Sequence, residues 1–330
     1  MSRKILVTGS AGLVGRATAT RLAESGFQVR AGLRRTAPPV SFAGHPAIEP
    51  TPCDLDDAAQ LRAAVAGADL VVHAAYGDEA AMAAQCRRLL SAMEQEGVAR
   101  LVQLSSIAVY GERTGLIVET DGPAGDPGPY GRAKLDCEEA IRRWGAAASG
   151  RAAVLLRPGV VYGRGSALWV DKMVERIEAG ALGDLGEAAS GPAPLVHVDD
   201  VAAAIEAATR LLLESGDGVS AVNLVGPETP PWRDYFAALA SAAGAPAPRP
   251  ASPVEAAARR ALALPAKAWA RLGLPGFRSL ALAPAPGEQA LFARDAVFSM
   301  ERAALGLGFR PMIGLAEGLA RTFGPAQPNR

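Results

Sequence analysis

The chain has 330 residues, which is enough for one large or two modest domains with a full hydrophobic core. Lys plus Arg and Asp plus Glu number 34 each, so the formal net charge is zero and nothing indicates a nucleic-acid partner. Its three cysteines are scattered, no apolar run is long enough to span a bilayer, and the start does not resemble a signal peptide; we therefore expect a cytoplasmic protein without disulfides or a metal site.

The first element is a short β-prone run at 4–8, followed by a glycine-rich turn and a helical stretch at 16–25. Strand, glycine turn and helix together form the context in which a glycine pattern predicts a dinucleotide site. Gly9 permits the tight turn, Gly12 lets backbone approach the pyrophosphate, and Gly15 lets the helix pack on the strand. The alternative is a turn with incidental glycines. The cofactor-binding candidates here are Gly9, Ser10, Ala11, Gly12, Leu13, Val14 and Gly15.

The second predicted strand, 28–33, bears on the choice of dinucleotide. An NAD site usually ends this strand with an acidic residue that holds the ribose 2′-hydroxyl. Here Leu33 takes that place and is followed by Arg34 and Arg35, whose guanidinium groups suit a 2′-phosphate. The two arginines could also be a solvated loop. We expect NADP(H) as the cofactor, with NAD as the weaker alternative.

Further strand-like runs at 70–73, 101–104 and 154–157 alternate with helical stretches, which is typical of a parallel sheet. The fold class we predict is α/β, a Rossmann-type doubly wound parallel sheet with a smaller mixed C-terminal substrate region. His73 is interpreted as a packed strand residue. Residues after the third and fourth strands add the cofactor-binding candidates Asp54, Leu55, Ala74 and Ala75. Runs at 194–198 and 221–225 also look sheet-associated, so we assign 1–163 and 194–227 to the dinucleotide-binding domain and 164–193 and 228–330 to the substrate-binding region.

Tyr130 and Lys134 lie four residues apart, so on a helix they share one face. A free tyrosine has a pKa of about 10, and a nearby cation favours the phenolate, so the pair can serve as a proton donor with its activator. By itself this spacing is also compatible with an ordinary exposed helix.

With the glycine turn, Ser106, Tyr130 and Lys134 placed, the chain resembles the extended short-chain dehydrogenase/reductase (NAD(P)-dependent epimerase/dehydratase) family. The segments 104–111, 157–163, 196–201 and 307–311 carry the same resemblance. It implies that Ser106 hydrogen-bonds the substrate oxygen, that Tyr130 is the general acid/base, and that Lys134 lowers the tyrosine pKa and binds the nicotinamide ribose. It further implies that Pro158 and Val160 contact the cofactor.

Departures from the family pattern reduce the number of reactions that we expect this chain to catalyse. Sugar-nucleotide dehydratases carry Asp-Glu directly after the catalytic residue, whereas this chain has Ile107 and Ala108, which cannot move a proton. The long loop of sugar-nucleotide epimerases after the fourth strand is short here. The second strand with Arg34 is similar to that of dihydroflavonol-reductase-like and hydroxysteroid-dehydrogenase-like members of the family. In the reductase-like members, an arginine at the place of Arg34 contacts the NADP phosphate.

We therefore expect an oxidoreductase that transfers a hydride between NADP(H) and a carbonyl or secondary alcohol of a small or lipophilic substrate. The alternatives are an NAD-dependent nucleotide-sugar 4-epimerase and a non-catalytic NADPH-binding module. The basic, apolar segment 254–282 is expected to be ordinary packing helices, with a peripheral membrane contact as the alternative. The resemblance makes a homodimer plausible.

Overall fold

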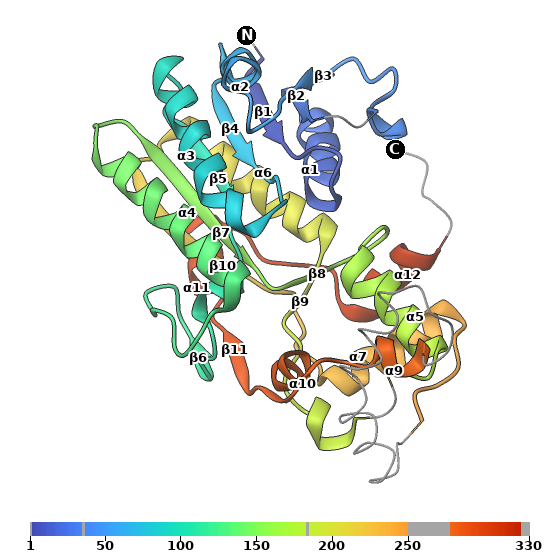
Figure 1. Ribbon diagram of the computed structural model, residues 1–330. Helices are drawn as coiled ribbons and strands as arrows, with labels where there is room; N and C mark the ends of the chain where they lie inside the picture. The colour runs from blue at the N-terminus through green and yellow to red at the C-terminus, as the bar shows by residue number, and fades with distance from the viewer. Residues whose placement is uncertain (1, 35–36, 183–184, 250–277, 325–330) are drawn as a thin grey trace.

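The computed structural model describes residues 2–34, 37–182, 185–249 and 278–324. Its main sheet has seven strands in the order β10-β7-β5-β4-β1-β2-β3, and every neighbouring pair is parallel (Figure 1). The chain moves outward from β1 to β3 and then returns to β4 on the other side of β1, as in doubly wound folds. The strands are β1 (Lys4–Thr8), β2 (Gln28–Leu33), β3 (Ile48–Pro52), β4 (Leu70–His73), β5 (Arg100–Leu104), β7 (Ala152–Pro158) and β10 (Gly218–Leu224).

Helices cover both faces of this sheet. α1 and α6 pack against each other on one face, and α2, α3 and α4 cover the other. Because crossover helices shield both faces, a parallel sheet can be apolar on each side. The bounds are α1 (Leu13–Glu24), α2 (Ala58–Val65), α3 (Glu79–Gln95), α4 (Gly128–Ala146) and α6 (Val198–Glu214).

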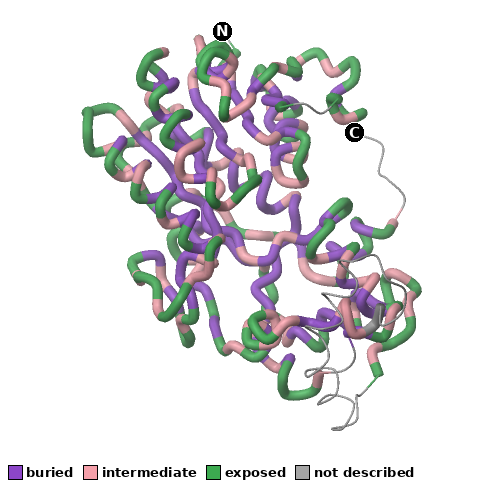
Figure 2. The backbone as a smooth tube through the Cα atoms, in the orientation of Figure 1, coloured by how far each residue is buried: buried purple, intermediate pink, exposed green. Residues whose placement is uncertain are grey.

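The strands divide their side chains between two cores with the period of two expected of β structure. In β1, Ile5 and Val7 belong to the core beneath α1 and α6, while Leu6 belongs to the core beneath α2, α3 and α4. All three are fully buried. Figure 2 shows the strands of the sheet as buried backbone in the interior, with exposed residues on the outer helices.

A third core lies in the group of helices below the sheet in Figure 1. It is centred on aromatic side chains; the ring centroids of Trp232 and Phe292 are 4.8 Å apart, and those of Phe236 and Phe292 are 5.1 Å apart. A short parallel sheet of β8 and β9 leads into it. The elements of this part are β8 (Val160–Tyr162), η3 (Ala167–Asp171), α5 (Lys172–Glu178), η4 (Gly186–Ala189), β9 (Leu195–His197), α7 (Trp232–Ala243), α9 (Arg278–Leu282), α10 (Pro286–Ala293) and α12 (Leu315–Phe323).

The chain returns to the main sheet near its end. β11 pairs with β6, and Ala303 of α11 is buried in the core beneath α1 and α6. A fourth, smaller core joins Phe298 of β11 to Val109 and Tyr110 of the 3₁₀ turn η2. The remaining elements are η1 (Val40–Phe42), η2 (Ile107–Tyr110), β6 (Gly115–Ile117), β11 (Ala296–Phe298) and α11 (Glu301–Gly306).

The predicted fold class is confirmed, and the strands expected at 4–8, 28–33 and 70–73 are present with those bounds. The first helix begins three residues earlier than expected, at Leu13. Of the segment 254–282, only the last five residues, which form α9, belong to the described part of the chain. No helix among the described residues is both long and apolar enough to cross a membrane.

Candidate active site

The glycine turn after β1 is held directly against the end of β4. Gly9 has a φ of 69°, a conformation that favours glycine. A Cβ atom on Gly9 would lie 2.5 Å from the Cα atom of Ala75 and 2.9 Å from the carbonyl oxygen of Ala74. Neither contact could be tolerated, so a glycine is needed here to bring the two predicted cofactor segments together.

The N-terminus of α1 opens from this turn without a side-chain cap. Gly12 is the N-cap residue, and the Ser10 hydroxyl instead donates to the carbonyl oxygen of Val7 at 2.7 Å. Gly12 and Ala11 are exposed. The first backbone N–H groups of the helix, beginning at Leu13 and Val14, are therefore available to an anion, which is the arrangement that binds a dinucleotide pyrophosphate.

Gly15 lies where α1 crosses the strand. A Cβ atom on this residue would lie 2.7 Å from the carbonyl carbon of Gly9 and 3.0 Å from the Cα atom of Ser10. The close helix–strand packing expected of the third glycine is therefore present.

Arg34 follows β2 at the carboxyl edge of the sheet and is exposed, with no hydrogen-bond or ion-pair partner among the described residues. Arg35 lies outside the described residues. Beyond β3, the side chain of Asp54 accepts a hydrogen bond from the Asp56 backbone at 3.1 Å, and the Leu55 carbonyl accepts one from Arg88 at 3.2 Å. A free guanidinium at the end of β2 suits an anionic group such as a 2′-phosphate.

Ser106 and Tyr130 meet at the end of β5. Ser106 is nearly buried and caps η2, accepting a hydrogen bond from the Ala108 backbone at 3.1 Å. Burial raises the pKa of Tyr130 to about 12, while the neighbouring Ser106 side chain opposes this rise. The ring of Tyr76, an exposed residue after β4, contacts the Tyr130 ring edge-on at a centroid distance of 5.7 Å. The Tyr130 phenol is therefore protonated at neutral pH and can act as an acid.

Lys134 lies one turn further along α4, and its Nζ atom is 5.7 Å from the centre of the Tyr130 ring. The side chain is buried, and Nζ donates to the carbonyl oxygen of Leu104 at 2.8 Å. Burial lowers the pKa of Lys134, against the charges of Cys137, Cys86 and Glu138. From the spacing of the pair we expected Lys134 to lower the pKa of Tyr130. In the structure the largest influence on this pKa is burial of the phenol, and burial raises it.

His73 ends β4 beside these groups. It is buried, and its Nδ1 atom shares a hydrogen bond with the Thr8 hydroxyl at 2.7 Å. Burial, with the charge of Lys134 adding to it, lowers the pKa of His73 to about 3. The ring is therefore neutral and part of the strand packing, as the sequence indicated.

The last two predicted contacts lie where β7 leads into β8. Pro158 is buried and pairs with Leu224 of β10, whereas Val160 pairs with Leu195 and its side chain belongs to the third core. Pro158 therefore shares the carboxyl edge of the main sheet with Ser106, while Val160 belongs to the short second sheet.

A buried charged group behind Ser106 was missed by the sequence reasoning. Glu138 and Arg157 form an ion pair at 2.6 Å, and both side chains are almost fully buried. Two signals could have indicated it: Glu138 follows Lys134 by one further helical turn, and Arg157 is the only charge in an otherwise apolar strand. Among the described residues, no group of His, Cys, Asp or Glu is arranged to hold a metal ion.

Comparison with known proteins identifies a family and a relative that match most of the chain. The model of the NAD dependent epimerase/dehydratase family matches residues 5–221. The 2-alkyl-3-oxoalkanoate reductase of Stenotrophomonas maltophilia (strain K279a) is 30% identical over 334 residues, covering 96% of this chain and 98% of the relative.

Among solved structures, an epimerase from Methanothermobacter thermautotrophicus superposes with a TM-score of 0.75 at 19% identity, covering 98% of this chain and 91% of the other. The UDP-glucuronic acid 4-epimerase from Bacillus cereus in complex with NAD gives a TM-score of 0.71 at 19% identity, with coverage of 97% of each chain. At these identities the likeness shows the fold alone.

Proposed function

This chain belongs to the NAD dependent epimerase/dehydratase family, and on that premise we propose that it is an NADP(H)-dependent carbonyl reductase. As a family member it is an NAD(P)-dependent enzyme of the extended short-chain dehydrogenase/reductase type. The proposal concerns the finer points: the cofactor is NADP(H), and the substrate is a small or lipophilic 3-oxo compound without a nucleotide. The reverse reaction is oxidation of the matching secondary alcohol.

The observation that carries the proposal is the placement of Ser106 next to a protonated Tyr130 at the end of β5, with Lys134 on the same face of α4. Reduction of a carbonyl leaves negative charge on oxygen, which needs a proton donor and a second hydrogen bond. Tyr130 supplies the proton from its hydroxyl, and Ser106 supplies the second hydrogen bond. The ammonium group of Lys134, held on the Leu104 carbonyl, provides positive charge beneath the phenol.

The described residues fit a nicotinamide dinucleotide. When bound, this cofactor supplies or accepts the hydride at the substrate carbon. The uncapped N-terminus of α1 would bind its pyrophosphate, Ala74 and Ala75 beside Gly9 would contact it with small side chains, and Arg34 would bind a 2′-phosphate. Lys134, whose Nζ atom lies on the Leu104 carbonyl and 5.7 Å from the centre of the Tyr130 ring, would bind a hydroxyl of the nicotinamide ribose.

The substrate class rests on two supports. Ile107 and Ala108, which follow Ser106, offer no second acid or base, so the site is equipped for one proton transfer coupled to hydride transfer. The relative that matches over nearly the whole chain is a reductase of 2-alkyl-3-oxoalkanoates. The exposed ring of Tyr76 beside Tyr130 adds an apolar surface suited to an alkyl chain.

The test is oxidation of NADPH and NADH by the purified protein with 2-alkyl-3-oxoalkanoates, their short unbranched analogues, and UDP-glucose. We expect turnover of the 3-oxo acids with NADPH preferred, and loss of at least about 100-fold in kcat for Tyr130→Phe. Interconversion of UDP-sugars by a tightly held NAD, without reduction of any ketone, would overturn the proposal in favour of a 4-epimerase. NADPH binding with neither activity would indicate a non-catalytic module.

A further inference from the structure

We propose that Glu138 is a positioning residue that acts through Ser105 to hold the end of β5 in the register at which Ser106 meets Tyr130. The inference rests on the proposed reductase function, because it concerns the same Ser106–Tyr130 pair. Neither Glu138 nor Ser105 touches the reacting atoms in this arrangement, so both act through a neighbour.

Three successive turns of α4 contact three successive residues at the end of β5. Tyr130 lies next to Ser106, Lys134 donates to the Leu104 carbonyl at 2.8 Å, and Glu138 accepts from the Ser105 hydroxyl at 2.6 Å. Residues four apart lie on one helical face, so these contacts form one row along α4. Two contacts of the row therefore determine where the third, the proton-donating pair, is placed.

Glu138, the last residue of this row, is held by two hydrogen bonds from Arg157. The Nε atom donates to Glu138 Oε1 at 2.9 Å and Nη2 donates to Oε2 at 2.6 Å, so the carboxylate cannot rotate away from Ser105. Side-chain exposure is 5% for the arginine and 3% for the glutamate. Burial alone would raise the pKa of Glu138, but Arg157 and Ser105 hold that pKa below its ordinary value, so the carboxylate is charged and accepts a hydrogen bond from the Ser105 hydroxyl.

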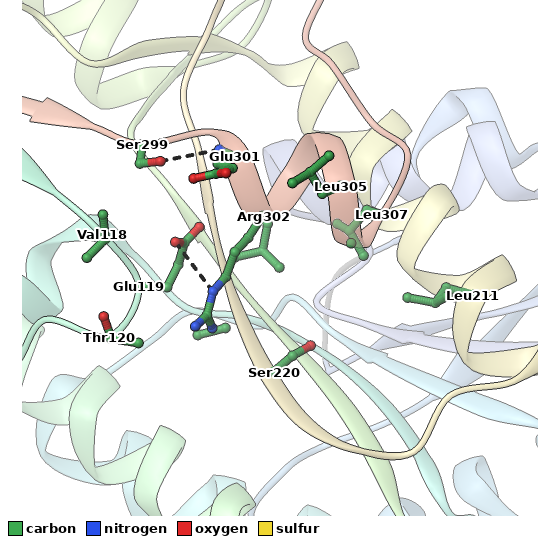
Figure 3. A pocket seen from close by; sticks show the side chains of 13 residues that line it. Val118, Glu119, Thr120, Leu211, Ser220, Ser299, Glu301, Arg302, Leu305 and Leu307 are labelled. Atoms are coloured by element: carbon green, nitrogen blue, oxygen red, sulfur yellow. Dashed lines mark hydrogen bonds and ion pairs between the residues drawn. The ribbon is translucent and has the colours of Figure 1, made fainter.

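Arg157 is in turn held from two further sides. Its Nη1 atom donates to the Tyr110 hydroxyl at 2.7 Å and to the Glu119 carbonyl oxygen at 3.1 Å, and the Tyr110 hydroxyl donates to the Asn223 side chain at 2.6 Å. The backbone of Asn223 donates to Glu119 Oε1 at 2.9 Å. Glu119 pairs with Arg302 at 3.8 Å on the wall of a 460 Å³ pocket between β10 and α11, where Figure 3 shows the two side chains facing each other.

The position of this ion pair argues for alignment over simple stabilisation. A buried ion pair stabilises a fold little compared with apolar side chains of the same volume, because both charges lose their hydration. What the pair adds here is direction: its carboxylate accepts from the hydroxyl of Ser105, the residue before Ser106, while its guanidinium fixes the orientation of that carboxylate. An apolar pair would fill the space without setting that angle.

The experiment compares Ser105→Ala with Ser105→Thr, which restores a hydroxyl donor, and with Arg142→Ala as the control. Arg142 contacts the same Glu138 carboxylate at 3.4 Å but from a 41% exposed position. Ser105→Ala removes one neutral hydrogen bond and leaves the ion pair intact, whereas Glu138→Gln would leave the Arg157 charge unpaired in the core and endanger folding. The readouts are kcat, KM, the NADPH Kd and the solvent deuterium isotope effect on kcat.

For Ser105→Ala we expect kcat to fall about tenfold and the solvent isotope effect to rise, with KM and the NADPH Kd within about twofold of wild type. Ser105→Thr should recover most of the loss, and Arg142→Ala should match wild type. A Ser105→Ala enzyme with unchanged kcat and isotope effect, or one altered only in melting temperature, would overturn the positioning role. If wild type and Tyr130→Phe are equally active, the proposed function itself fails; if Tyr130→Phe is inactive and Ser105→Ala is normal, only this inference fails.

Discussion

The ammonium group of Lys134 is hydrogen-bonded to the carbonyl oxygen of Leu104 at 2.8 Å, at the end of the strand that leads to Ser106. The lysine is therefore tied to the sheet before any ligand binds, with its charge 5.7 Å from the centre of the Tyr130 ring. In the proposed reaction this charge would already be in place when substrate and cofactor bind, so the lysine would need little rearrangement.

Replacing Lys134 should affect cofactor binding and chemistry together. For Lys134→Met, which keeps the length of the side chain, we expect the NADPH Kd to rise about tenfold and kcat to fall at least about 100-fold. Binding is measured by NADPH fluorescence and turnover by the reductase assay. Arg132→Ala, an exposed residue of the same helix paired with Asp126 on the surface, is the matched control and should leave both values unchanged.

Arg34 should determine the preference between the two dinucleotides. Loss of a charge-assisted hydrogen bond to a 2′-phosphate should lower kcat/KM for NADPH by about 10- to 100-fold in Arg34→Ala, with NADH changed little. Arg143→Ala on the exposed face of α4 tests for a general effect of lost charge. Equal losses with NADPH and NADH would contradict a role in recognising the phosphate.

Gly9 and Gly26 provide a matched test of the close approach to β4. Both have positive φ, 69° and 90°, but a Cβ atom on Gly26 would meet nothing within 4 Å. Gly26→Ala should therefore cost only backbone strain, about 1–2 kcal/mol in the free energy of unfolding. Gly9→Ala adds a collision with Ala75 to this strain, so its free energy of unfolding should fall clearly further. This variant should also lose dinucleotide binding. Urea unfolding measures the first quantity and NADPH titration the second; similar losses in both variants would refute the steric account.

His73 should make the fold sensitive to acid. Its pKa is about 3 in the fold, lowered by burial from an ordinary value near 6.5, so the unfolded chain takes up the proton first as pH falls. The stability contributed by the neutral ring is complete above about pH 6.5 and is lost by about 1.4 kcal/mol per pH unit between that value and pH 3. His73→Asn should show a shallower decline of unfolding free energy across this window. Parallel pH curves for the two proteins would contradict the assignment.

Much of the fold was readable from local pattern. The run 4–8 and the glycines after it predict strand, turn and helix because each residue type acts within a few positions of its own backbone. The pairing of Tyr130 with Lys134 follows in the same way from helical spacing. The NADP preference and the catalytic roles remain predictions, since they depend on ligands.

The features that could not be predicted arise from contacts between distant segments. The Arg157–Glu138 pair joins a strand to a helix. From the sequence alone Glu138 would be predicted to be a surface charge, and the single arginine in an apolar strand has no evident partner. The raised pKa of Tyr130 was also missed, because spacing shows which charge is near but not how far the phenol is removed from water. The ring of Tyr76 reaches Tyr130 from another loop, so the sequence holds no local signal for that contact.

The return of the chain to the main sheet has a consequence for how the protein is made. β11 completes a pair with β6, whose residues are synthesised about 180 positions earlier, and Ala303 fills a place in the core beneath α1 and α6. A nascent chain that ends just after β10 therefore still lacks the apolar side chains that β11 and α11 contribute. All seven strands of the main sheet are made once β10 is complete, but β6 and the core beneath α1 and α6 still lack their C-terminal partners, so truncation before Ala296 would leave both incompletely covered.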